Sequence, residues 1–71
     1  MTKKILIEGM SCGHCVKHVE EALKELEGVK SVKVDLAGKN AVVELAHEVA
    51  DDKLKATIDE VGYDVVGIEV L

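Results

Sequence analysis

The sequence predicts an α+β fold in which two helices cover one face of a four-stranded antiparallel sheet. The first observation is the order of apolar periods along the chain: strand-like, helical, strand-like, strand-like, helical, strand-like. The second is a glycine after each helical stretch, because Gly28 follows the first stretch and Gly62 follows the second. The third is internal similarity, since Leu-Glu-Gly-Val at residues 26–29 is echoed by Glu-Val-Gly-Tyr at residues 60–63.

The first half of the chain predicts a strand, a loop and a helix. Residues 4–8 are expected to form the strand, because β-branched isoleucines flank a leucine there. Residues 9–14 contain two glycines and a serine, a composition typical of a loop. From Cys15 a helix is expected, ending at Gly28. Its apolar face recurs at helical spacing and consists of Val16, Val19, Leu23 and Leu26.

The middle of the chain predicts a hairpin. Apolar and polar residues alternate over residues 32–36, and Ala41, Val43 and Leu45 recur at every second position on the return strand, which indicates two half-buried strands. Between them, residues 37–40 read Ala-Gly-Lys-Asn, in which glycine and asparagine accept positive φ. Residues 46–50 are expected to form a loop.

The last part predicts a second helix and a fourth strand. Asp51 and Asp52 place negative charge where a helix begins. The apolar stripe of this helix is expected at Leu54, Ile58 and Val61, and that of the strand at Val66, Ile68 and Val70. A helix between two strands rules out their pairing through a tight turn, and right-handed crossovers place both helices on one face of the sheet. The expected architecture is therefore the ferredoxin-like βαββαβ arrangement.

Composition excludes several functions. The chain has 71 residues, too few for more than one small domain, so residues 1–71 are expected to form a single domain. Nine Lys and Arg residues against 14 Asp and Glu residues give a net charge of −5, and Tyr63 is the one aromatic residue, which disfavours nucleic-acid binding. Apolar runs do not exceed three residues, so neither membrane insertion nor a signal peptide is expected. We expect a cytoplasmic protein, and not an enzyme.

The chemistry of the sequence is concentrated in Cys12-Gly13-His14-Cys15, at the predicted junction of loop and helix. A helix N-terminus favours thiolate over thiol and prepares such a pair to bind a metal. Two buried, inert cysteines would not suit a glycine-flanked loop. A covalent haem site needs His after the second Cys, where Val16 stands. Closed zinc sites need four ligands and iron–sulfur clusters usually need four cysteines.

A dithiol oxidoreductase is the strongest rival from the motif itself. Cys-Gly-His-Cys is also an active-site sequence of protein disulfide isomerases, and a dithiol at a helix start is reactive. The thioredoxin fold of those enzymes needs a cis-proline beside the dithiol, and this chain has no proline. It also has Ser11, rather than the usual Trp, before the first cysteine. Redox catalysis is therefore the third interpretation.

Residues 9–15, Gly-Met-Ser-Cys-Gly-His-Cys, resemble the Gly-Met-(Thr/Ser)-Cys-x-x-Cys motif of the heavy-metal-associated domain. The resemblance covers essentially the whole chain, because Gly28 after the first helix and Gly62-Tyr63 after the second also match the family. It is greatest to bacterial copper chaperones. It implies Cu(I) held by the thiolates of Cys12 and Cys15. It also implies delivery to a copper-transporting P-type ATPase or a copper-responsive repressor, and copper could bridge two chains into a homodimer. Ser11 argues against zinc- and cadmium-type domains, which often carry an acidic residue there.

The second interpretation is a metal-binding module of a P-type ATPase or a mercury-binding protein; a chain that begins with Met1 favours the free-standing chaperone. Soft thiolates select Cu(I) without appeal to the family. Around the two cysteines, Met10 is expected to pack rather than ligate. Tyr63 could either screen the metal or pack in the core. Residues expected to position the loop or surround the metal are Met10, Ser11, Gly13, His14 and Tyr63.

Overall fold

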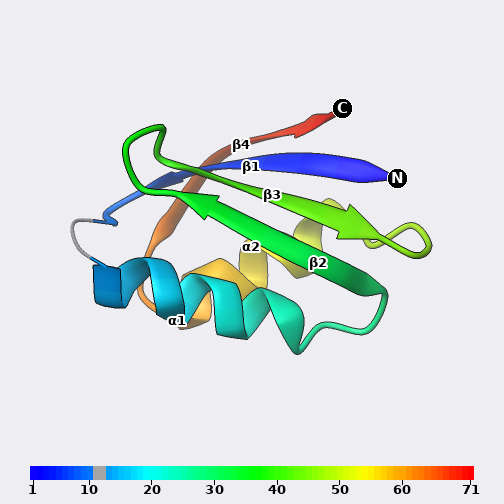
Figure 1. Ribbon diagram of the computed structural model, residues 1–71, viewed down its shortest axis with the longest axis horizontal. Helices are drawn as coiled ribbons and strands as arrows, with labels where there is room; N and C mark the ends of the chain where they lie inside the picture. Colours follow the sequence, from blue (N-terminus) through cyan, green and yellow to red (C-terminus); the bar gives the residue numbers. More distant parts are fainter. Residues whose placement is uncertain (11–12) are drawn as a thin grey trace.

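The structure, a computed structural model, describes residues 1–10 and 13–71. Its elements follow the expected βαββαβ order (Figure 1). They are β1 (Thr2–Glu8), α1 (Gly13–Lys24), β2 (Val29–Asp35), β3 (Asn40–Leu45), α2 (Asp51–Glu60) and β4 (Asp64–Val70). The four strands form one antiparallel sheet in the order β2-β3-β1-β4, which confirms the predicted ferredoxin-like fold.

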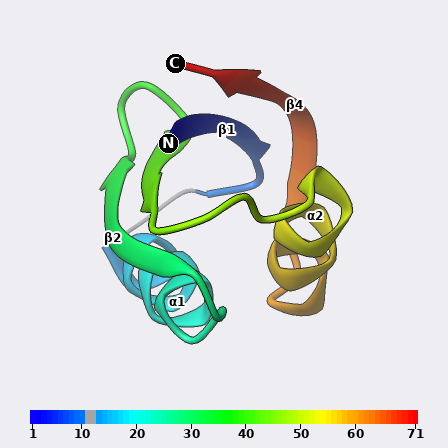
Figure 2. The same ribbon diagram turned by 90° about the vertical axis from the view of Figure 1, so that its right-hand side faces the viewer.

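Both helices lie on the same face of the sheet, as Figure 2 shows end-on. Alternation along each strand places one set of side chains toward the helices. In β1 the buried positions are every second residue, and in β3 they are Ala41, Val43 and Leu45. These residues meet the buried faces of the helices in a single core: Ile5, Ile7, Met10, Val19, Leu23, Ala41, Val43, Leu45, Val49, Leu54 and Ile58.

The helix bounds differ from those expected. Helix α1 begins at Gly13 rather than at Cys15, so His14 is helical and not in the loop. The helix ends at Lys24, four residues before Gly28, and residues 25–28 form turns. Gly28 has φ +95°, so it reverses the chain at the start of β2 instead of directly following the helix.

The last strand departs from simple alternation. Its register against β1 shifts between Leu6 and Ile7, where an irregularity of the β-bulge type interrupts the ladder. Val65 and Ile68 therefore both pack against the core, and Val66, expected to face inward, is 61% exposed. An extra residue in one strand reverses the facing of those that follow it.

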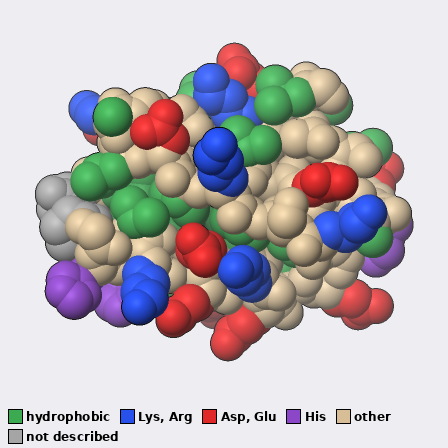
Figure 3. All heavy atoms as spheres, in the orientation of Figure 1, with side chains coloured by type: hydrophobic (Ala, Val, Ile, Leu, Met, Phe, Trp, Pro, Cys, Tyr) green, Lys and Arg blue, Asp and Glu red, His purple; other side chains and the backbone are tan. Residues whose placement is uncertain are grey.

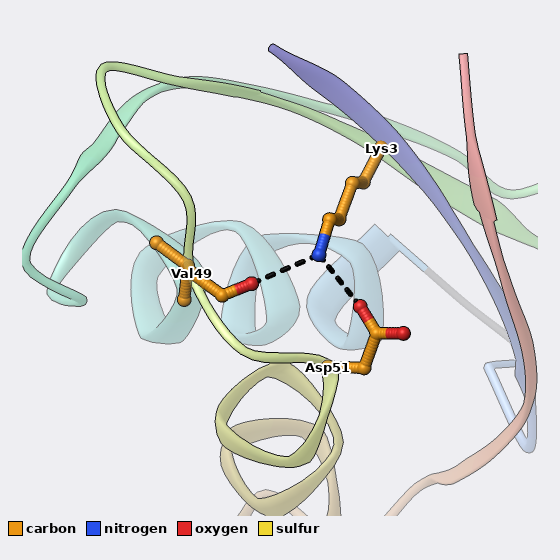
Figure 4. Close-up of polar contacts among 3 residues, drawn as sticks. All are labelled: Lys3, Val49 and Asp51. Carbon is orange, nitrogen blue, oxygen red and sulfur yellow. Dashed lines mark hydrogen bonds and ion pairs between the residues drawn. The ribbon is translucent and has the colours of Figure 1, made fainter.

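A buried lysine joins the sheet to the second helix (Figure 4). Lys3 occupies an inward position of β1 and is only 4% exposed. Its Nζ donates to the carbonyl oxygen of Val49 at 2.9 Å and to Oδ1 of Asp51 at 2.7 Å. Helix α2 has Ala50 at its N-cap and no side-chain capping hydrogen bond, and the Lys3 ammonium links β1 to Val49 and Asp51 on either side of that position.

Candidate metal site

The candidate site lies where β1 ends and α1 begins. Strand β1 is central in the sheet and pairs with β3 on one side and β4 on the other. Beyond the pairing of Leu6 with Asn40, which is the last between β1 and β3, the Ile7 amide still donates to the carbonyl oxygen of Lys39, at 2.8 Å. The strand that leads into residues 9–12 is therefore held on both sides almost to its end.

Glycine is required where the chain leaves β1. Gly9 has φ +98°, a left-handed conformation that side chains disfavour. A Cβ on Gly9 would also lie 3.4 Å from Cδ1 of Tyr63. Tyr63 follows α2 and packs half-buried against the core. The aromatic ring thus lies beside the Gly9 backbone, so two residues far apart in the sequence meet at the end of β1.

Met10 turns inward. Its side chain is 8% exposed and belongs to the central core. A buried, flexible thioether next to the motif fixes the start of the loop to the body of the protein. Ser11 and Cys12, which the sequence predicts as a loop-positioning residue and a metal ligand, lie outside the described residues.

The first turn of α1 carries the remaining members of the motif. Gly13 is exposed, and a Cβ there would meet nothing within 4 Å. His14 is exposed, whereas Cys15 is half-buried and packs against the core. At the beginning of a helix, backbone N–H groups lack intrahelical acceptors and the helix dipole is positive. Both features favour the thiolate of Cys15, so its sulfur is suited to binding a soft cation.

Hydrophobic and histidine side chains gather at the end of the molecule where β1 meets α1 (Figure 3). Within residues 1–10 and 13–71, His, Cys, Asp and Glu form no group of three or more that could hold a metal ion. The described part of the chain therefore offers no closed cage around Cys15. Across the same residues, no helix has the length and apolar character needed to cross a membrane.

The sequence gives no sign that the backbone of the β2–β3 hairpin binds the end of β1. Lys39, which has φ +54°, brings the β2–β3 turn beside the end of β1 through its carbonyl oxygen. The turn itself is built by Asp35, whose Oδ1 accepts from the Gly38 amide at 3.0 Å. The Ala-Gly-Lys-Asn turn was recognisable, but only the strand order shows that it lies at the site end.

The model of the heavy-metal-associated domain matches residues 4–64, most of the chain. The chain belongs to this family. It is 44% identical over 70 residues to a protein named copper chaperone CopZ from Staphylococcus aureus (strain bovine RF122 / ET3-1), covering 93% of this chain and 100% of the relative.

Solved structures agree. A CopZ metallochaperone superposes with a TM-score of 0.87 at 40% identity, covering 93% of this chain and 100% of the other. A copper-binding domain from HMA7, a P-type ATPase, superposes with a TM-score of 0.84 at 28% identity, covering 99% and 100%. The likeness thus extends to separate chaperones and to domains of transporters.

Proposed function

We propose that this protein is a copper chaperone that binds Cu(I) through Cys12 and Cys15 and passes it to a copper-transporting P-type ATPase by ligand exchange. The observation that carries the proposal is the Cys-x-x-Cys motif of residues 12–15, whose second cysteine, Cys15, lies in the first turn of α1. The likeness over full length to relatives named copper chaperones supports it.

The donor set fits Cu(I) on chemical grounds. Thiolates are soft ligands and favour a soft monovalent ion over harder divalent ions. Two sulfurs leave the ion under-coordinated, so a thiolate of a partner can add as a third ligand. One of the original sulfurs can then leave, and copper moves without being released to water. A carrier needs this openness, whereas a four-ligand site would retain the ion.

The surrounding residues have supporting roles in the proposal. Met10 holds the loop through core packing, and its burial leaves the thioether facing the protein interior. Tyr63 packs over Gly9 and shields one side of the loop. Gly13 keeps the helix start open to an approaching partner. We assign Ser11 a role in loop conformation, and His14, being exposed, no bond to Cu(I).

The proposed partner is a domain of the same fold. A P-type ATPase copper-binding domain is among the similar structures, so donor and acceptor would present equivalent loop–helix junctions. Two such junctions can approach head to head and share one ion between their sulfurs. The same geometry would allow a copper-bridged homodimer, and delivery to a copper-responsive repressor would use the same exposed end. We place this exchange in the cytoplasm, where thiols stay reduced.

Single Cys→Ser variants test the proposal. Cys12→Ser and Cys15→Ser should each lose tight Cu(I) binding, measured under anaerobic conditions by competition with a chromophoric Cu(I) chelator. Asp52→Ala, which changes an exposed residue of α2, is the matched control and should bind as the unaltered protein does. The far-UV circular dichroism of all variants should be unchanged. Stoichiometric tight binding by either serine variant would exclude the two-thiolate site.

A further inference from the structure

We infer that His14 and His18 form a second metal site, for a borderline divalent ion of the Cu(II) or Ni(II) type, separate from the thiolates. The two histidines are four residues apart in α1, which spans Gly13–Lys24. Both side chains are exposed. This site does not depend on the proposed function, because neither imidazole needs a sulfur ligand beside it.

Helix geometry brings the two imidazoles together. Residues at i and i+4 lie on the same face of a helix, with Cβ atoms about 5–6 Å apart. Two rings at that spacing can turn toward one ion between them. Neither ring is engaged in a hydrogen bond or ion pair elsewhere in the part of the chain that the structure describes. Their nitrogen lone pairs are therefore not committed to other groups.

The charges around the pair favour a cation on balance. The positive end of the α1 dipole and Lys17, which lies between the histidines in sequence, oppose it. Glu21 and Glu25 follow on the next turns, and both are exposed. Glu21 is three residues after His18, which places its carboxylate on the same side of the helix. The net charge of −5 adds a long-range attraction for cations.

The donor type selects the class of ion. Imidazole nitrogen binds Zn(II), Ni(II) and Cu(II), and the general affinity order places Cu(II) highest. Among the described residues, no His, Cys, Asp or Glu group of three or more could hold a metal, so water must complete the coordination. The result is an exposed site with exchangeable water ligands. It prefers borderline divalent ions, whereas a pair of soft thiolates prefers a soft monovalent ion.

The test uses the full chain with both thiols removed, Cys12→Ser/Cys15→Ser. Cu(II) is supplied as its glycine complex, and binding is measured by isothermal titration and by electron paramagnetic resonance. Into this background His14→Gln and His18→Gln are introduced separately. His47→Gln is the matched control, because His47 is also exposed but lies in the loop between β3 and α2. Circular dichroism verifies the fold of each variant.

We expect His14→Gln and His18→Gln each to lower Cu(II) affinity about tenfold or more, which is about 1.4 kcal/mol, because the second imidazole binds intramolecularly. His47→Gln should leave the affinity unchanged, and the nitrogen couplings of the Cu(II) spectrum should change only in the first two variants. A loss below about threefold in either variant, or an equal loss in the control, would overturn the inference. Because the test protein contains no thiol, its result is independent of whether Cys12 and Cys15 bind Cu(I).

Discussion

Replacing Asp51 by alanine should destabilise the protein far more than its exposure suggests. The side chain of Asp51 is 57% exposed, and substitutions at such surface positions usually change the free energy of unfolding by less than about 0.5 kcal/mol. Its partner is different, because the side chain of Lys3 is only 5% exposed. Removing the carboxylate leaves an ammonium group in the sheet–helix interface with Val49 as its remaining acceptor.

The magnitude lies between two limits. Breaking a fully buried ion pair by removing one partner costs about 3–5 kcal/mol, whereas an exposed pair is worth about 0–1 kcal/mol. The Lys3–Asp51 pair is buried at one end and solvated at the other, so we expect Asp51→Ala to cost about 2 kcal/mol. For a domain of this size, that corresponds to a fall of about 10 °C in Tm.

Asp52 provides the matched control. It is also an exposed acidic residue in the first turn of α2, so Asp52→Ala loses the same favourable interaction with the helix dipole. The difference between the two variants isolates the contact with Lys3. Urea unfolding followed by circular dichroism would give both free energies, in the absence of metal so that binding does not contribute.

Lys3→Met completes a double-mutant cycle. Methionine keeps most of the apolar stem and removes the charge, so we expect a cost of about 1 kcal/mol, smaller than that of Asp51→Ala. The double variant should be more stable than the sum of the single effects implies, with a coupling of about 1–2 kcal/mol. Equal effects of Asp51→Ala and Asp52→Ala, or strict additivity in the cycle, would refute this account of the buried lysine.

Three further predictions concern the loop, the chain reversal before β2 and the metal. Met10→Leu should keep Cu(I) affinity near that of the unaltered protein and cost under about 1.5 kcal/mol in urea unfolding, because it conserves volume in the core; a large affinity loss in a folded variant would make the thioether a ligand. Gly28→Ala should cost about 1–2 kcal/mol in the same assay because φ is +95° there, and an unchanged stability would contradict the left-handed conformation. Cu(I) affinity should fall as pH is lowered, because binding requires thiolates, and chelator competition should give the same pH dependence for His14→Ala; a flatter profile would mean that His14 binds the ion.

The topology could be predicted because each element has a clear period. Alternation in β3 and helical spacing of Val19 and Leu23 or of Leu54 and Ile58 led directly to the observed layers. The start of α1 was missed because Gly13 and His14 have low helix propensity and carry no apolar signal. The apolar periodicity of a helix does not reveal that its first turn begins before the first apolar residue of the repeat.

Which side chains of β4 point toward the core, and that Lys3 is buried, could not be predicted from the sequence for a different reason. A bulge depends on how two strands pair, so β4 alone gives no sign that Val66 points outward. Lys3 continues the inward alternation of Ile5 and Ile7, but a charged residue is ordinarily expected at the surface. Its burial became interpretable only once Asp51 and the Val49 carbonyl were brought beside it by the crossover.

At the site, the motif was predicted to lie at the junction of loop and helix, and Cys15 lies in the first turn of α1. The packing of Tyr63 over Gly9 could not be derived from spacing. The two residues are brought together because β1 and β4 are neighbours in the sheet. Cys12 and Ser11 stay predictions, since they lie outside the described residues.

The two chain ends lie at the end of the molecule remote from the β1–α1 junction (Figure 1). They are also tied together, because the Leu71 amide donates to the Thr2 carbonyl at 2.9 Å. A tether, a label or a fused neighbour can therefore be joined at either end and project away from the thiols. Copies strung together, or immobilised on a sensor surface by one end, would all present the same face outward. In such a chain of copies, linker length would set how closely the β1–α1 junctions of adjacent copies can meet.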